Sequence, residues 1–302
     1  TEQGMALKDV CSFTKHCGGA PINIAAATAK LGAHSKVLTK VGADAFGDFI
    51  LETLSLCQVD ITAVKRTKQY PTALAFVALD EKGNRDFTFY RDPCADLHLS
   101  AEDITATMFQ DCGILHFCSV DLVDSPMKQA HLKAIQLAKE QGAIISFDPN
   151  VRLPLWSSKE DCKNTILEFA PYADILKISD DELFFLTGQK DCEQVFTVFP
   201  DATIILLTCG EQGSYLMTKE HRLYEKPIPV KAIDTTGAGD AFAAAFLYQL
   251  LRDGISRDQL PHLSKDILQV YLRFSNAYAA DSTTKYGAVH AMATTQEFHE
   301  FL

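Results

Sequence analysis

The chain has 302 residues, 47% of them apolar, so it is long enough to bury one large hydrophobic core. Its 28 basic and 39 acidic side chains give a net charge of −11, which argues against sequence-independent binding to nucleic acid or anionic lipid. All of its apolar runs fall far short of the roughly 20 residues that a membrane-spanning helix needs.

The first predicted unit covers residues 17–42. Its stretch "CGGAPINIAAATAKLG" (17–32) begins with two glycines and continues as an alanine-rich helix that we expect to end near Gly32. The run "SKVLTKVG" (35–42) then reads as a strand. The paired glycines fit either a tight turn against a packed helix or a ligand-binding turn.

A β-hairpin is predicted next. Residues 72–92, "TALAFVALDEKGNRDFTFYRD", contain two alternating runs joined by the turn "EKGN" (81–84). A hairpin does not fit into a parallel sheet, so we expect it to stand apart from the rest of the fold.

Beyond about residue 100, short β-rich runs alternate with helical stretches, the pattern of a parallel sheet covered by helices. Between the first two runs lies a helix with Ser125 as the expected N-cap, Pro126 in its first turn and Gly142 after its end. This is a βαβ unit. The four predicted strands are "GILHFCS" (113–119), "AIISFDP" (143–149), "DILKIS" (174–179) and "TIILLTCG" (203–210).

No repeat, low-complexity tract or Pro/Gly linker interrupts the sequence, so we expect no second independent domain. We predict a large α/β domain of residues 18–70 and 94–302. Residues 1–17 and 71–93 would form a small β lid over its edge. The exposed edge of this lid is the surface through which we expect a homodimer.

The stretch "IDTTGAGDAFAAAFLYQLL" (233–251) combines a polar glycine turn with an apolar helix. Glycines at a helix entrance let backbone N–H groups converge on an anion, and the helix dipole adds to that field. Asp240 in this place either caps the helix or works beside a phosphate. Five residues exceed what a simple turn requires: Thr235, Thr236, Gly237, Gly239 and Asp240.

Several site classes are excluded by their missing motifs. The sequence contains neither G-x-x-x-x-G-K-[ST] nor a G-x-G-x-x-G that follows a strand, which argues against a P-loop and a dinucleotide fingerprint. The nine cysteines are scattered without a C-x-x-C pair, so we interpret them as buried thiols in a reducing, cytoplasmic compartment rather than as a zinc site.

Seven stretches, in order over nearly the whole chain, resemble the successive signatures of the ribokinase-like (PfkB) carbohydrate kinase family. The stretches at 83–99 and 146–156 most resemble those of fructokinases. The resemblance implies an α/β, ribokinase-like three-layer sandwich with a central, mostly parallel sheet and a small β lid. The stretches are "GGAPINIA" (18–25), "VGADAFGDF" (41–49), "GNRDFTFYRDPCADLHL" (83–99), "SFDPNVRLPLW" (146–156), "LKISDDEL" (176–183), "LTCGEQGS" (207–214) and "DTTGAGDAF" (234–242).

This resemblance also implies an activity, the transfer of the γ-phosphoryl group of ATP to a sugar hydroxymethyl, with D-fructose giving fructose 6-phosphate. The backbone amides of Gly237, Ala238, Gly239 and Asp240 would form an anion hole, and the Asp240 carboxylate would be the base. An aspartate with an unperturbed pKa of about 3.9 is a weak base for an alcohol. It would therefore accept the proton late and orient the hydroxyl until then.

Further roles follow from motif position alone. The implied sugar-binding residues are Gly18, Gly19, Asn23, Arg91 and Arg152. The implied nucleotide-binding residues are Lys177, Gly210, Gly213, Asn276 and Gly287. The alternatives are a helix-start residue for Asn23, a surface salt bridge for each arginine and a solvent-facing strand lysine for Lys177.

Two departures from the family pattern concern metal and sugar binding. Where the magnesium-associated motif usually reads N-x-x-E, this chain has Ser179 but retains Glu182, which we expect to order Mg²⁺ through water. A monovalent cation such as K⁺ is also implied near the 234–240 turn. The first strand of the family, which carries a sugar-binding aspartate, should precede Thr1 and is not in this sequence.

Three alternatives stay open. A kinase of the same family that acts on 2-keto-3-deoxygluconate, ribose or a nucleoside would share every catalytic feature. A catalytically silent regulatory homologue is disfavoured by the intact loop around Asp240, and a dehydrogenase by the missing dinucleotide fingerprint. The expected partners are thus ATP and a small sugar, without nucleic acid or membrane.

Overall fold

The computed structural model describes residues 4–5, 7–79, 85–189 and 195–301. Within this part, no helix is both long and apolar enough to cross a membrane. The strands are β1 (Lys40–Gly42), β2 (Lys65–Thr67), β3 (Leu74–Leu79), β4 (Arg85–Tyr90), β5 (Ile114–Cys118), β6 (Ile144–Asp148), β7 (Ile175–Ser179), β8 (Ile204–Thr208), β9 (Ser214–Met217) and β10 (Arg222–Glu225). The helices are α1 (Ala20–Lys30), α2 (Ala45–Leu56), α3 (Pro126–Glu140), α4 (Lys159–Phe169), α5 (Asp180–Thr187), α6 (Val195–Val198), α7 (Ala238–Arg252), α8 (Lys265–Ser282), α9 (Ala288–Ala291) and α10 (Thr295–Phe301).

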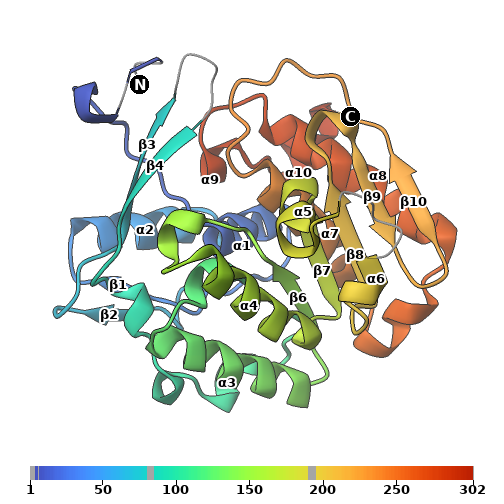
Figure 1. Ribbon diagram of the computed structural model, residues 1–302, viewed down its shortest axis with the longest axis horizontal. Coiled ribbons are helices and arrows are strands. Elements are labelled where there is room, and N and C mark those ends of the chain that lie inside the picture. Colours follow the sequence, from blue (N-terminus) through green and yellow to red (C-terminus); the bar gives the residue numbers. More distant parts are fainter. Residues whose placement is uncertain (1–3, 6, 80–84, 190–194, 302) are drawn as a thin grey trace.

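Six strands form the central sheet in the order β10-β9-β8-β7-β6-β5 (Figure 1). β5 to β8 run parallel to one another, and β9 and β10 are antiparallel additions at one edge. The four strands expected from the sequence are β5 to β8, each within two residues of its predicted bounds. The α/β fold with a mostly parallel sheet is therefore confirmed.

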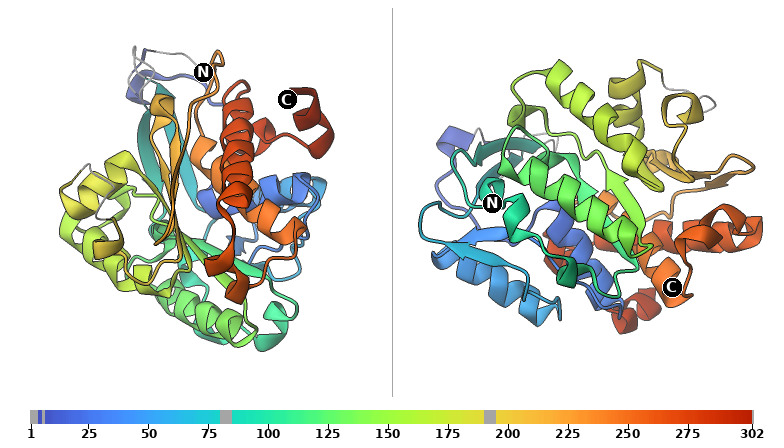
Figure 2. Two further views of the ribbon diagram at one scale, coloured as in Figure 1. Left: turned by 90° about the vertical axis from the view of Figure 1, so that its right-hand side faces the viewer. Right: turned by 90° about the horizontal axis from the view of Figure 1, so that it is seen from below.

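Helices cover both faces of this sheet because its inner strands are apolar on both sides. On β8, Ile205 and Leu207 belong to a core shared with α3, α4 and α5. Ile204 and Leu206, which alternate with them, pack in a second core with α1, α7 and α8. The left view of Figure 2 shows the sheet between these two layers of helices, as expected for a three-layer sandwich.

The strand predicted for residues 35–42 is shorter than expected. Only its last three residues are strand, and this β1 pairs in parallel with β2 in a separate two-stranded sheet. β2 is itself only three residues long, so it offers a short ladder. Upstream of β1, a single bridge between Lys36 and Asp60 replaces the expected pairing.

A cavity of about 1570 Å³ lies between β5 and the segment 32–41. Its walls include apolar side chains of α1, α3 and α7, and it extends to Asp240 at the start of α7. On the cavity side β5 is an edge strand, because among the described strands it pairs only with β6. The further strand expected before Thr1 stays a prediction.

The predicted hairpin is confirmed. β3 and β4 pair in antiparallel register, Leu74 opposite Tyr90, and they stand apart from the central sheet at the upper left of Figure 1. Their predicted turn, 81–84, lies outside the described residues. Phe13 packs edge-on against Phe76 with the ring centroids 5.0 Å apart, so residues before Gly18 do contact the hairpin. The domain boundaries themselves stay a prediction.

Candidate active site

The site forms at the entrance of α7, which places Asp240 in the first turn of that helix. Gly237 precedes the helix with φ 78°, a left-handed conformation that favours glycine. Asp234 ties the turn to the segment before α9, since one of its carboxylate oxygens accepts the Gly287 N–H at 3.0 Å. The helix entrance therefore has a defined shape before any ligand binds.

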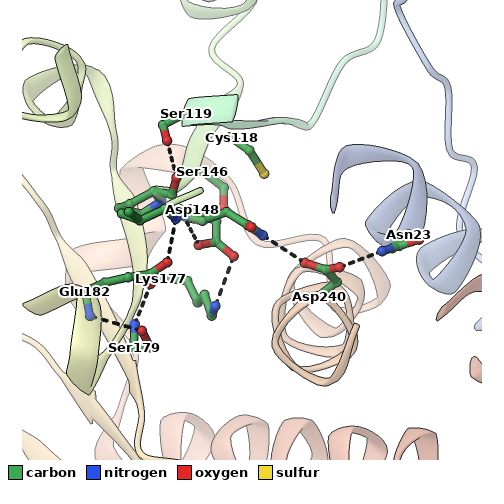
Figure 3. Close-up of polar contacts among 12 residues, drawn as sticks. Asn23, Cys118, Ser119, Ser146, Asp148, Lys177, Ser179, Glu182 and Asp240 are labelled. Atoms are coloured by element: carbon green, nitrogen blue, oxygen red, sulfur yellow. Dashed lines mark hydrogen bonds and ion pairs between the residues drawn. The ribbon is translucent and has the colours of Figure 1, made fainter. Parts of the chain in front are cut away.

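The Asp240 carboxylate is 6% exposed and is held from two sides (Figure 3). Asn23 Nδ2 on α1 donates to Oδ2 at 2.7 Å, and Asn150 Nδ2, from the loop after β6, donates to Oδ1 at 3.3 Å. Burial raises the pKa of Asp240, while the Asn23 hydrogen bond and the charges of Lys177 and Arg152 oppose that rise. The carboxyl is thus a stronger base than an exposed aspartate.

A buried ion pair lies beside this carboxylate. Lys177 Nζ on β7 is 3.0 Å from Asp148 Oδ2 at the end of β6. The ammonium also lies against α7, because a Cβ on Gly239 would be 2.8 Å from Nζ. Burial lowers the pKa of Lys177, but Asp148, Glu182 and Asp240 together raise it above its usual value. The alternative of a solvent-facing lysine is therefore wrong.

One ammonium in this site faces three carboxylates. Burial raises the pKa of Asp148 to about 7 although Lys177 opposes the shift, and Glu182 and Asp240 add to it. The Asp148 carboxyl therefore loses its proton only as the pH approaches neutrality. We refer to Asp148, Asn150, Lys177, Glu182 and Asp240 as the base cluster.

Glu182 is occupied by the protein backbone. Its Oε1 accepts the Val151 N–H at 2.8 Å, and its Oε2 accepts the Ser179 N–H at 2.9 Å. Ser179 Oγ in turn accepts the Glu182 N–H at 3.2 Å, completing a capping box that starts α5. Burial would raise the pKa of Glu182, but Lys177 and the backbone donors lower it.

These contacts bear on the expected metal role. Within the described residues, no group of three or more His, Cys, Asp and Glu side chains could hold a metal ion directly. Each Glu182 oxygen retains a second lone pair, so the carboxylate can still accept hydrogen bonds from water on a cation. This geometry therefore favours a water-mediated contact of Glu182 with a metal ion over direct ligation.

The expected sugar-binding residues Gly18, Gly19, Asn23 and Arg152 all line the cavity that reaches Asp240. The Asn23 side chain is buried, and its Oδ1 lacks a hydrogen-bond partner. A buried acceptor without a partner is costly unless a ligand satisfies it, and a sugar hydroxyl could. The Arg152 guanidinium donates to the Val151 carbonyl at 2.9 Å and also faces the cavity.

Arg91 lines the same cavity but is held by protein groups. Its Nε donates to Asp96 Oδ2 at 2.7 Å, and its terminal nitrogens contact Asp121 and the Val120 carbonyl. The side chain is 12% exposed, so this ion pair is mostly buried rather than on the surface. Arg91 joins the end of β4 to the turn after β5, and it would have to leave these partners to bind a ligand.

The expected nucleotide-binding residues do not all come together. Gly287 lines the cavity with Asp240, whereas Gly210 and Gly213 lie in the β8–β9 turn, away from the cavity lining. Asn276 on α8 uses its side chain within the protein, since Nδ2 donates to the Lys226 carbonyl at 2.6 Å. These three residues would contribute to a nucleotide site from a neighbouring surface.

Two members of the base cluster were not singled out from the sequence, Asp148 and Asn150. Both lie at the carboxyl end of a parallel strand, where ligands of open α/β sheets bind. The signal that could have found them is the Asp-Pro-Asn sequence that directly follows the apolar run of β6.

Comparisons with known proteins agree with this geometry. The family model described as "pfkB family carbohydrate kinase" matches residues 2–295. The chain is similar to probable fructokinase-2 of Arabidopsis thaliana, with 39% identity over 305 residues that cover 100% of this chain and 91% of that protein. It is 38% identical to fructokinase-2 of Solanum lycopersicum, over 98% of this chain and 90% of that protein.

Solved structures are similar over the same length. A fructokinase of Xylella fastidiosa with bound ATP superposes with a TM-score of 0.91 at 31% identity, covering 99% of this chain and 94% of that one. A fructokinase of Vibrio cholerae with fructose, ADP and calcium bound gives a TM-score of 0.85 at 33% identity, covering 96% and 92%.

Proposed function

The chain belongs to the pfkB family of carbohydrate kinases, and from this premise we propose that it transfers the γ-phosphoryl group of ATP to the hydroxymethyl oxygen of D-fructose, forming fructose 6-phosphate. The observation that carries this proposal is the Asp240 carboxylate, fixed by two amides at a glycine-rich helix entrance that opens on the large cavity. We choose fructose among the hexoses because relatives of this chain are named fructokinases.

In this reaction Asp240 would orient the attacking hydroxyl and accept its proton. The sugar oxygen forms a bond to the γ-phosphorus as the bond from that phosphorus to the ADP oxygen breaks. The proton moves from the sugar oxygen to the Asp240 carboxylate. Because burial raises the pKa of Asp240, proton acceptance is more favourable than it would be in water.

Charge on the transferring group would be stabilised by fixed donors. The N–H groups at the start of an α-helix have no partner within the helix, and here Gly237, Gly239 and Asp240 supply them, whereas the Ala238 N–H donates to the Thr235 carbonyl at 3.3 Å. The helix dipole favours an anion at this end. Lys177 lies against Gly239 and brings a protonated ammonium to the same place. These groups need no rearrangement when negative charge develops, which lowers the barrier.

Cations are part of the proposal. Glu182 would accept hydrogen bonds from water bound to Mg²⁺, and this cation would supply positive charge to the phosphates of ATP. Asp234 and the 234–237 turn would lie near a monovalent cation such as K⁺. A related fructokinase structure contains potassium, and an E. coli relative contains ATP and Mg²⁺.

We also propose a cytoplasmic location and a homodimer through the hairpin edge. The eight cysteines in the described residues form no disulfide with one another, which fits a reducing compartment. The β3–β4 hairpin is a separate two-stranded sheet, so its edges are available to a second copy. Size-exclusion chromatography with light scattering would report the mass of the assembly directly.

The test of the activity is ADP release by the purified protein with MgATP and fructose, glucose, ribose, 2-keto-3-deoxygluconate or adenosine. We expect rapid turnover with fructose and almost none with Asp240→Asn, whose amide cannot accept the proton. Turnover with a different acceptor would replace fructose but keep the mechanism. A protein that binds ATP and turns over none of the acceptors would overturn the proposal.

A further inference from the structure

Asn150 has a backbone conformation that few side chains adopt. It has φ 43°, in the left-handed region, and it is buried in the loop that follows β6. Asparagine tolerates this region better than most residues, but such a conformation persists only where its surroundings hold it. An unfavourable backbone at the end of a parallel strand, beside the proposed base, calls for a functional explanation.

The conformation of Asn150 is fixed by the carboxylates of the base cluster. Asp148 Oδ1 accepts the Asn150 N–H at 3.0 Å, which closes a short turn, and the other Asp148 oxygen is paired with Lys177. The next residue, Val151, donates its N–H to Glu182 Oε1 at 2.8 Å. Side chains from β6, β7 and α5 therefore set the direction of a single amide.

That amide points at the proposed base. Asn150 Nδ2 lies 3.3 Å from Asp240 Oδ1, and Asn23 Nδ2 lies 2.7 Å from Asp240 Oδ2 (Figure 3). The two amides differ in what else they can do. Both residues line the cavity, but Asn23 has a buried oxygen without a partner, whereas Asn150 is anchored through its own backbone N–H.

We propose that Asn150 is the positioning residue for Asp240. Its amide fixes the rotation of the carboxylate, so that one oxygen faces the sugar hydroxyl while the other stays on Asn150. The Asp148 turn holds this amide in place. This inference rests on the proposed function, because it assigns a role within that reaction.

The charges around Asp240 determine how the role can be measured. The groups that face it are Lys177 on β7, Arg152 after β6, Glu182 on α5, Asp148 on β6 and the buried thiol of Cys118 on β5. A hydrogen bond donated to a carboxylate stabilises its ionised form, so loss of the Asn150 amide should raise the pKa of Asp240. The acid limb of the rate profile should then move to higher pH.

The first variant is Asn150→Gly, because glycine keeps the left-handed backbone and removes only the amide. We expect kcat to fall roughly 10-fold to 100-fold, with the fructose KM changed less than about threefold. The acid limb of the kcat–pH profile should move to higher pH by about half a pH unit. The matched control is Asn164→Ala, which removes an exposed amide on α4 away from the cavity lining and should leave kcat and the pH profile unchanged.

The second variant is Asn150→Asp, which keeps the shape and tolerates the same backbone conformation. Its carboxylate would face Asp240 directly, so the acid limb should move up by more than in the glycine variant. This variant decides the question if Asn150→Gly fails to fold by circular dichroism. The positioning role of Asn150 is overturned if the wild type is active and the folded variants have a kcat within twofold of it and the same acid limb of the pH profile. A wild type that is inactive on every acceptor would instead overturn the proposed function.

Discussion

The base cluster and the β3–β4 hairpin are built in opposite ways. In the cluster, Lys177 and Asp148 are 7% and 0% exposed, and each carboxylate is held by two or more groups. The hairpin is a separate two-stranded sheet in which Tyr90 is 64% exposed, and Phe13, which packs against it, is 44% exposed. Groups that must keep a fixed geometry are buried and doubly held, whereas the hairpin, which also lines the cavity, leaves large aromatic rings exposed.

The sharpest test of the cluster is the base itself. Asp240→Asn should lower kcat by about 10² to 10⁴, because proton acceptance is lost while the amide keeps the shape. The fructose KM should change little, and steady-state kinetics give both constants. A fall in sugar affinity with unchanged kcat would place Asp240 among binding groups instead.

Removal of the buried cation should affect folding as well as rate. Lys177→Met leaves Asp148 buried without its partner, which should lower the free energy of unfolding by about 3–5 kcal/mol in urea denaturation. The double variant Asp148→Asn with Lys177→Met removes both charges and should recover part of this loss. A loss below about 1 kcal/mol in the single variant would mean that water reaches the site.

The same carboxyl gives a pH dependence of defined sign. The pKa of Asp148 is about 7 in the folded chain and about 3.9 when unfolded, so the folded state binds the extra proton. Its contribution to stability is complete below about pH 4 and is lost as the pH rises towards 7. Relative to Asp148→Asn, the wild type should lose up to about 1.4 kcal/mol per pH unit in that window. Parallel stability curves for the two proteins would contradict this assignment.

The smallest effect is expected at the hairpin. Phe13→Ala removes the edge-on contact with Phe76 and should lower the free energy of unfolding by about 0.5–1.5 kcal/mol. Phe117→Ala, which removes a ring stacked on Phe147 in the core, is the matched comparison and should cost about 3–5 kcal/mol. Equal losses would show that the hairpin is as tightly packed as the core.

Much of the fold could be predicted because its signals are local. Apolar runs with β-branched residues define β6, β7 and β8, and Pro126 marks the first turn of α3. The strand at 35–42 was overestimated because strand length depends on a neighbour, and β2 is short. That neighbour is not visible in a local pattern.

The site was only partly predictable for the same reason. Asp240 can be recognised from the glycine-rich turn that contains it, but the role of Asn150 depends on its contact with Asp240, which lies 90 residues away along the chain. Arg91 was read as a ligand-binding group, and its carboxylate partner Asp121 lies 30 residues further on. The sequence leaves Lys177 with two alternatives, a nucleotide-binding residue or a solvent-facing one, because the burial of a side chain cannot be read from one strand.

The free edge of β5 also affects how the purified protein should behave in solution. Its residues Ile114, Leu115 and His116 are half-buried beside the large apolar cavity, and the backbone groups on that side have no neighbouring strand among the described residues. Such an edge is a template for strand addition between molecules. Wherever this edge is left uncovered, the molecule should bind hydrophobic dyes and self-associate as its concentration rises, and an extended peptide that pairs with the edge should suppress both effects.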